Sequence, residues 1–144
     1  LLAGGAEVHA RSDHGWTPLH SVLISPNLEC VLKTEVAVLL VENGADVNAR
    51  IPPGNWPLNM AAALGDKAVT QLMLAKGADV NARNYDGSTP LLAAARAGHM
   101  GVAEALLAAG AEVNAYDKNG VTPLRWAKHD EMKALLRKYG GKEG

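Results

Sequence analysis

The sequence predicts an all-α solenoid in which helix–turn–helix units, each followed by a β-hairpin-like finger, stack in a row. Two landmarks indicate this fold. The first is a glycine followed closely by Pro-Leu, in GWTPL, GNWPL, GSTPL and GVTPL, which begin at Gly15, Gly54, Gly87 and Gly120. The second is GA[DE]V[NH]A, which begins at Gly5, Gly44, Gly77 and Gly110. Both are spaced by 39, 33 and 33 residues, and such a period indicates a repeat architecture.

The composition is consistent with closely packed helices. Apolar residues make up 48% of the 144 residues, are rich in Ala and Leu, and include no Phe. The net charge is −1 and no block of Lys or Arg stands out, which argues against nucleic-acid binding. No apolar run approaches the length of a membrane span, and no signal peptide is visible. The single cysteine, Cys30, excludes an internal disulfide. We therefore expect an intracellular, cytoplasmic protein.

The clearest unit, residues 84–115, justifies each element of the repeat. Thr-Pro at 89–90 predicts a helix start, because the threonine hydroxyl can accept a free backbone N–H and proline suits the first helical position. This helix should end near Gly98. A second helix is expected over 100–108, where apolar residues recur at helical spacing. The stretch 111–120 then predicts an extended finger closed by a glycine turn.

These residues resemble the ankyrin repeat. The matching features are TPLH at 17–20, its degenerate copies beginning at Trp56, Thr89 and Thr122, AGH at 97–99, and the four GA[DE]V[NH]A segments. The resemblance covers essentially the whole chain. It implies a stack of helix pairs with fingers along one edge. It also implies a concave surface, built from fingertips and first helices, that usually binds other proteins.

We expect one domain over residues 1–144. Because LLAGG resembles the last turn of a second helix, the natural protein is expected to continue upstream. The last unit has a charged helix suited to a cap, and is shortened by four residues between Thr122 and Leu135 relative to Thr89 and Leu106. The predicted parts are a partial repeat at 1–11, repeats at 12–50, 51–83 and 84–115, and a C-terminal capping repeat at 116–144.

One repeat carries an insertion. The unit that begins with TPLH has six extra residues, placed at about 25–34 in SPNLECVLKT. Leu28, Leu32 and Val36 continue the apolar face of the following helix backwards, so we expect a second helix longer by about a turn and a half. The insertion is either slack in the scaffold or a bump that contacts a partner, and we favour slack.

A tryptophan replaces a helix cap in the next repeat. Trp56 stands in GNWPL where the other units have threonine before proline. Losing such a cap costs about 1 kcal/mol, so the indole should gain something in exchange. Either it is buried between neighbouring units or it contacts a ligand, and we favour burial.

The resemblance places the partner-binding surface on fingertips and first helices. Trp16 and Tyr85 are the aromatic residues that we most expect to be exposed anchors. The expected finger residues are Asp13, His14, Trp16, Pro52, Pro53, Asn55, Tyr85, Asp86, Ser88, Lys118, Asn119 and Val121. The expected first-helix residues are Ile24, Ala63, Arg96 and His129.

Catalysis is not indicated. The histidines are scattered over different repeat positions, no metal-ligand spacing occurs, Cys30 has no evident base partner, and no phosphate-binding glycine loop is present. We predict no catalytic residues, metal or cofactor. We expect a protein partner of unknown identity, no nucleic-acid or membrane binding, and a monomer in isolation.

The leading hypothesis is therefore a non-catalytic protein–protein interaction module. A second is a regulatory or stabilising segment that packs against other parts of a larger protein. A third is a substrate, because LVENGADVNA and LLAAGAEVNA resemble ankyrin segments whose asparagine, here Asn48 or Asn114, is hydroxylated by a dioxygenase.

Overall fold

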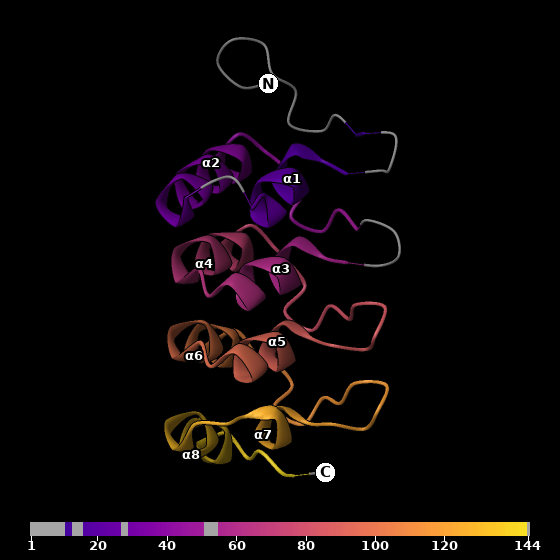
Figure 1. The fold of residues 1–144 in the computed structure, drawn as a ribbon, viewed down its shortest axis with the longest axis vertical. Coiled ribbons are helices and arrows are strands. Elements are labelled where there is room, and N and C mark those ends of the chain that lie inside the picture. Colours follow the sequence, from indigo (N-terminus) through magenta and orange to yellow (C-terminus); the bar gives the residue numbers. More distant parts are fainter. Residues whose placement is uncertain (1–10, 13–15, 27–28, 51–54, 144) are drawn as a thin grey trace.

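The computed structural model describes residues 11–12, 16–26, 29–50 and 55–143, and within them the helices form two layers (Figure 1). The first helices are α1 (Pro18–Ile24), α3 (Pro57–Leu64), α5 (Pro90–Ala97) and α7 (Pro123–Trp126). The second helices are α2 (Cys30–Glu42), α4 (Lys67–Ala75), α6 (Met100–Ala108) and α8 (Asp130–Lys138). Each first helix packs on the next first helix, and each second helix on the next second helix. The predicted all-α solenoid is confirmed.

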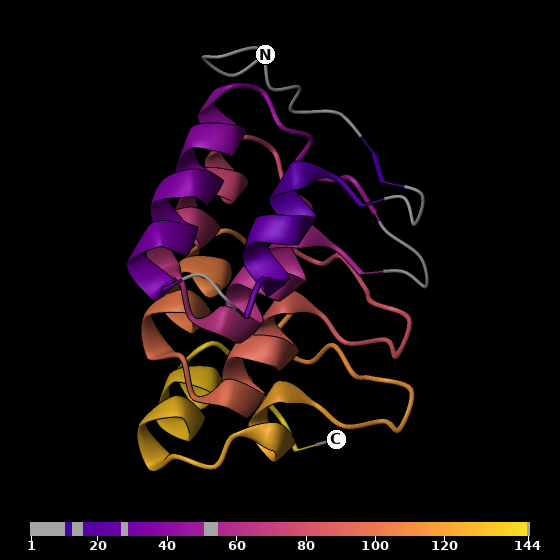
Figure 2. The same cartoon turned by 45° about the horizontal axis from the view of Figure 1, so that its top comes forward.

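Finger-like loops project from the side of the stack where the first helices lie (Figures 1 and 2). Two of them close in the same way. The N–H of Asn84 donates to the carbonyl of Ser88 at 2.9 Å, and the N–H of Asp117 donates to that of Val121 at 3.2 Å. A glycine completes each turn, with the N–H of Gly87 donating to Asn84 and that of Gly120 to Asp117.

The first helices begin where the local sequence predicts, and α5 also ends there. Each has proline at its start, after a residue with extended backbone. At Thr89 the hydroxyl oxygen accepts the N–H of Leu92 at 3.3 Å. α3 and α5 end at Gly65 and Gly98, whose φ angles of 78° and 80° lie in the left-handed region that favours glycine.

The core consists of two columns of side chains that cross every repeat. One column comes from the first helices, at Leu19, Leu58, Leu91 and Leu124. The other comes from the second helices, at Leu40, Met73, Leu106 and Leu136. All are at most 4% exposed. Because these side chains belong to one core cluster that runs from repeat to repeat, the apolar burial is distributed along the stack and not around a single centre.

Asparagines join the loops that follow the second helices of successive repeats. The Asn48 amide donates to the carbonyl of Gly77 at 2.9 Å and accepts the N–H of Asp79 at 2.9 Å. Asn81 accepts the N–H of Glu112 at 2.8 Å. Asn114 donates to the carbonyl of Gly140 and accepts the N–H of Lys142. Asparagine at this repeat position therefore stabilises the contact between successive repeats.

The inserted repeat has a longer second helix, as expected, but its predicted apolar face is wrong in part. α2 has 13 residues whereas α4 has nine. Thr34 donates from its hydroxyl to Asp66, the residue that caps the start of α4. The turn of α2 before Thr34 therefore extends beyond the first residue of α4. Leu32 is consequently 44% exposed. Leu28 lies outside the described residues.

The last repeat is shortened by three residues, not by the four that we expected. Leu136, and not Leu135, is the counterpart of Leu106: each is the seventh residue of its nine-residue helix, and each is fully buried. The shortening falls on the first helix, since α7 has four residues whereas α5 has eight.

Candidate functional site

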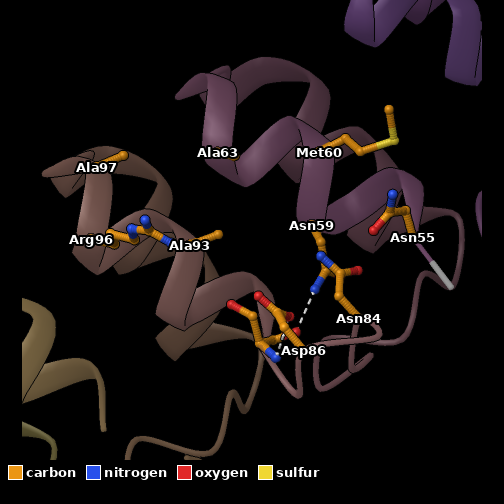
Figure 3. Close-up of a pocket in the computed structure, with 10 residues that line it drawn as sticks. Asn55, Asn59, Met60, Ala63, Asn84, Asp86, Ala93, Arg96 and Ala97 are labelled. Carbon is orange, nitrogen blue, oxygen red and sulfur yellow. Dashed lines mark hydrogen bonds between the residues drawn. The ribbon is translucent and has the colours of Figure 1, made fainter. Parts of the chain in front are cut away.

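A groove of about 550 Å³ opens between α3, α5 and the fingers that precede them (Figure 3). Its wall on one side comes from α3 and on the other from α5, and the finger that leads into α5 closes one end. The residues that line it are Asn55, Asn59, Met60, Ala63, Asn84, Asp86, Ser88, Ala93, Arg96 and Ala97.

The groove is hollow because small side chains occur where larger ones would fill it. Along the first helices, one repeat position holds Ser21, Met60, Ala93 and then Trp126. Ala93 is therefore preceded by a methionine and followed by a tryptophan at the equivalent positions of the neighbouring repeats. Ala63 and Ala97 widen the hollow on its two walls.

Asp86 lies at the finger end of the groove and is fixed by its own turn. Its Oδ1 accepts the N–H of Ser88 at 2.9 Å, and its carbonyl accepts the N–H of Lys118 from the next finger at 3.0 Å. Within the described part of the chain, Oδ2 makes no hydrogen bond. One carboxylate oxygen is therefore available in the groove.

Arg96 lies toward the far end of α5 and is stacked on a ring of the next repeat. Its Cζ is 4.7 Å from the centroid of the Trp126 ring, a cation–π geometry. The indole is fixed in turn, because its Nε1–H donates to Oδ2 of Asp117 at 3.1 Å. The guanidinium makes no hydrogen bond to the described residues, and the side chain is exposed.

Asp117 is the buried end of this chain of contacts, with 9% exposure. Burial alone would raise the pKa of its carboxyl. Hydrogen bonds from the Val121 N–H, the Trp126 indole and the Asn119 N–H, together with the charge of Arg96, outweigh burial and lower that pKa below its usual 3.8. The stabilisation from the ionised carboxylate is therefore complete above about pH 4, and is lost as pH falls through the lowered pKa.

Trp56 and Asn59 hold in place the finger that leads into α5 and closes one end of the groove. Trp56 is half-buried and its Nε1–H donates to the carbonyl of Arg83 at 2.9 Å. The Asn59 amide donates to the carbonyls of Ala82 and Ser88 at 3.0 and 2.9 Å. The cation of Arg50 lies 5.7 Å from the Trp56 ring centroid. The indole that replaces the helix cap therefore makes a cross-repeat contact.

The structure brings part of the expected surface together. Asn55, Ala63, Asp86, Ser88 and Arg96 all line the groove.

The remaining expected residues lie around the groove or outside it. Trp16, which we expected to be exposed, is half-buried, as is Val121, whereas Tyr85 is 54% exposed. Lys118 and Asn119 are exposed on the next finger. Outside the described residues lie Asp13, His14, Pro52, Pro53 and the side chain of Ile24.

The placement of His129 on a first helix is wrong. His129 is the residue before α8, and its ring packs against Gly98, where a Cβ would lie 3.0 Å from the His129 Cδ2 atom. Its counterparts are Asp66 and His99, which precede α4 and α6. Counting by 33 from Arg96 fails because the last repeat is three residues shorter.

Sequence reasoning missed the residues that shape the groove, mainly Met60, Ala93 and Trp126. A signal for them exists: the three share one repeat position, and the volumes along that position alternate between large and small. The role of Trp126 depends also on Asp117, which precedes it by nine residues and contacts it only after folding.

Other site chemistries find no support in the described residues. No group of three or more His, Cys, Asp or Glu there could hold a metal ion. None of the helices in this part of the chain is long and apolar enough to cross a membrane.

Comparison with known proteins agrees with the repeat architecture. A family model of ankyrin repeats, in three copies, matches residues 1–84 and again residues 58–143. No curated protein matches the sequence. Ankyrin repeats are generally protein–protein interaction modules and typically non-catalytic, and no catalytic domain was identified. The regular landmarks, the stacked helix pairs and these matches together show that the chain belongs to the ankyrin-repeat family.

Proposed function

We propose that this chain is a non-catalytic protein-binding module and that a partner binds in the groove between α3 and α5. The observation that carries the proposal is a preformed hollow lined by alanines, with a fixed carboxylate at one end and a stacked guanidinium toward the other. Side chains already held in place lose little conformational freedom on binding, so more of the contact energy is available as affinity.

The neighbouring fingers supply a rim for this groove. Lys118 and Asn119 are exposed on the finger after that of Asp86, and Tyr85 is exposed beside Asp86 in the same turn. Trp16 and Val121 are half-buried, and they occupy in their own repeats the position that Asn55 and Ser88 occupy in theirs. A polar rim around an apolar centre is the usual anatomy of a protein interface.

Filling the groove without changing charge tests the proposal. Ala63 is exposed and lines the groove, whereas Ala68 is exposed on α4 in the same repeat and outside it. Immobilised protein is used to capture partners from an extract of the source organism, identified by mass spectrometry. Ala63→Trp should remove the captured proteins, and Ala68→Trp should retain them. Equal capture by both variants, with unchanged circular dichroism, would refute the groove as the binding site.

One observation favours the second role, in which the chain packs on a larger protein. Leu32 and Leu39 are 44% and 50% exposed, and they lie seven residues apart on the same side of α2. If this face serves as a packing surface, Leu32→Gln with Leu39→Gln should reduce binding of a hydrophobic dye to the isolated chain. Unchanged dye binding would count against this role.

A further inference from the structure

We infer that the segment bound in the groove is an extended peptide with a basic side chain for Asp86 and an acidic side chain for Arg96. The inference rests on the proposed function, because it concerns the occupant of the same groove. It follows from two fixed charges of opposite sign and from the length of helix that separates them.

The Arg96 end is built to receive a carboxylate. Stacking on Trp126 at 4.7 Å fixes the plane of the guanidinium while leaving its N–H donors free of hydrogen bonds to the described residues. A guanidinium of fixed orientation can pair with a carboxylate through two parallel hydrogen bonds. The Trp126–Asp117 hydrogen bond holds the ring, so both residues act as positioning residues for Arg96.

The Asp86 end is built to receive a cation. Its Oδ1 is occupied by the Ser88 N–H, which orients the carboxylate, and its Oδ2 remains available in the half-buried finger. The neighbouring amides of Asn55 and Asn84 also line this end. An ammonium or guanidinium group from a partner would find its counter-charge here, together with the amide oxygen of Asn55 as an additional acceptor, whereas the amide oxygen of Asn84 already accepts the N–H of Trp56 at 3.3 Å.

The spacing of the two charges favours an extended segment. Thr89 caps α5 and Arg96 is its seventh residue, so these two residues are about 10 Å apart along the helix axis, and Asp86 lies in the finger at the Thr89 end of α5 (Figure 3). An extended chain covers that length in about four residues. The alanines between the two ends leave room for a backbone lying along α5. A polyanion such as nucleic acid would meet Asp86 unfavourably.

A random 12-residue peptide library displayed on phage, panned against the protein, tests this inference. Enriched sequences should carry Lys or Arg within about four residues of Asp or Glu, matching the groove length. Asp86→Asn keeps the acceptor for Ser88 and removes the charge, so it should abolish selection for the basic residue alone. Arg96→Gln should abolish selection for the acidic residue alone. Glu104→Gln and Lys76→Gln, exposed outside the groove, should change neither.

Binding of one enriched synthetic peptide, measured by calorimetry, gives the expected size. Either charge-removing variant should weaken it about tenfold, and replacing the matching peptide residue with Ala should then cause little further loss. Uncharged enriched sequences, no enrichment, or a chain that binds only its own second copy in sedimentation would overturn the inference. Peptides that lose binding with Ala63→Trp but ignore both charge variants would overturn it while sparing the proposed function. Peptides that still bind Ala63→Trp would overturn both.

Discussion

The first helices of two consecutive repeats begin with different chemistry at the same two positions. In α1 the pair is Thr17 and His20, and the contacts stay inside the repeat: Nδ1 of His20 lies 2.8 Å from the threonine Oγ1 and accepts the Thr17 N–H at 3.3 Å. In α3 the pair is Trp56 and Asn59, and both side chains donate to carbonyls of the next finger.

The difference predicts that the residues at the two positions compensate each other. Tryptophan cannot supply the hydroxyl that a histidine at position 59 would bind, and asparagine is too short to replace the imidazole. Asn59 instead spans two carbonyls of one finger while the indole holds a third, at Arg83. A contact that caps one helix has been exchanged for contacts that join two repeats.

The largest effect is expected from removing the cross-repeat contact. Asn59→Ala deletes two hydrogen bonds and leaves the carbonyl of the buried Ala82 unpaired, whereas that of Ser88 keeps the Asn84 N–H, so the free energy of unfolding should fall by about 1–3 kcal/mol. Urea unfolding followed by circular dichroism measures it. Asn55→Ala, in the same groove, is the control and should cost less than about 0.5 kcal/mol.

Rebuilding the first pair in the second repeat sharpens this prediction. Trp56→Thr and Asn59→His should each destabilise alone, and the double variant should recover about 1 kcal/mol relative to their sum. If the destabilisation of the double variant equals the sum of the two single effects, the two positions are independent and do not compensate each other.

An intermediate effect is expected from pH, because only the first repeat uses histidine here. Burial lowers the pKa of His20 below its usual 6.5; the nearby carbonyl of Ala49 opposes this, Arg11 adds to it, and Asp46 opposes it. The unfolded chain therefore binds a proton near pH 6.5 that the folded chain binds only at lower pH. Stability should fall as pH drops below 6.5, by at most about 1.4 kcal/mol per pH unit.

His20→Asn, which copies the residue at position 59, is the control, because the pH dependence that remains in this variant comes from the other histidines. The slope of unfolding free energy between pH 7.5 and 5.5 should be smaller in this variant than in the unchanged protein. Equal slopes would mean that His20 does not resist protonation.

The smallest effect is expected from Trp56→Phe. Phenylalanine keeps a ring for the cation of Arg50 and loses the hydrogen bond to the Arg83 carbonyl together with part of the half-buried ring surface, so the cost should be about 1 kcal/mol. Thermal melting can resolve it. A neutral result would assign the cross-repeat contact to Asn59 alone.

The repeat stack could be predicted because its signals are local. Proline after an extended residue starts each first helix, and glycine ends α3 and α5, so the period appears directly in the sequence. The exposure of Leu32 could not be predicted, because it depends on where the neighbouring α4 begins. The misplacement of His129 came from extending the period into a repeat that breaks it.

The candidate site could be predicted only in part, for a related reason. Asp86 and Arg96 occupy positions that the family resemblance marks. The hollow between them exists because Ala93 is small. Its small size can be recognised only by comparison with Met60 and Trp126, which occupy the same position in the neighbouring repeats. The fixed orientation of Arg96 likewise depends on Asp117, through a contact between separate elements.

The stacking of Arg96 on Trp126 links the groove to the integrity of the last repeat. The cation belongs to α5, and the ring that orients it belongs to α7. By thermodynamic reciprocity, a ligand that requires this orientation also opposes local opening of α7 and α8. Slower amide hydrogen exchange in those two helices would therefore report occupancy of the groove from a neighbouring repeat.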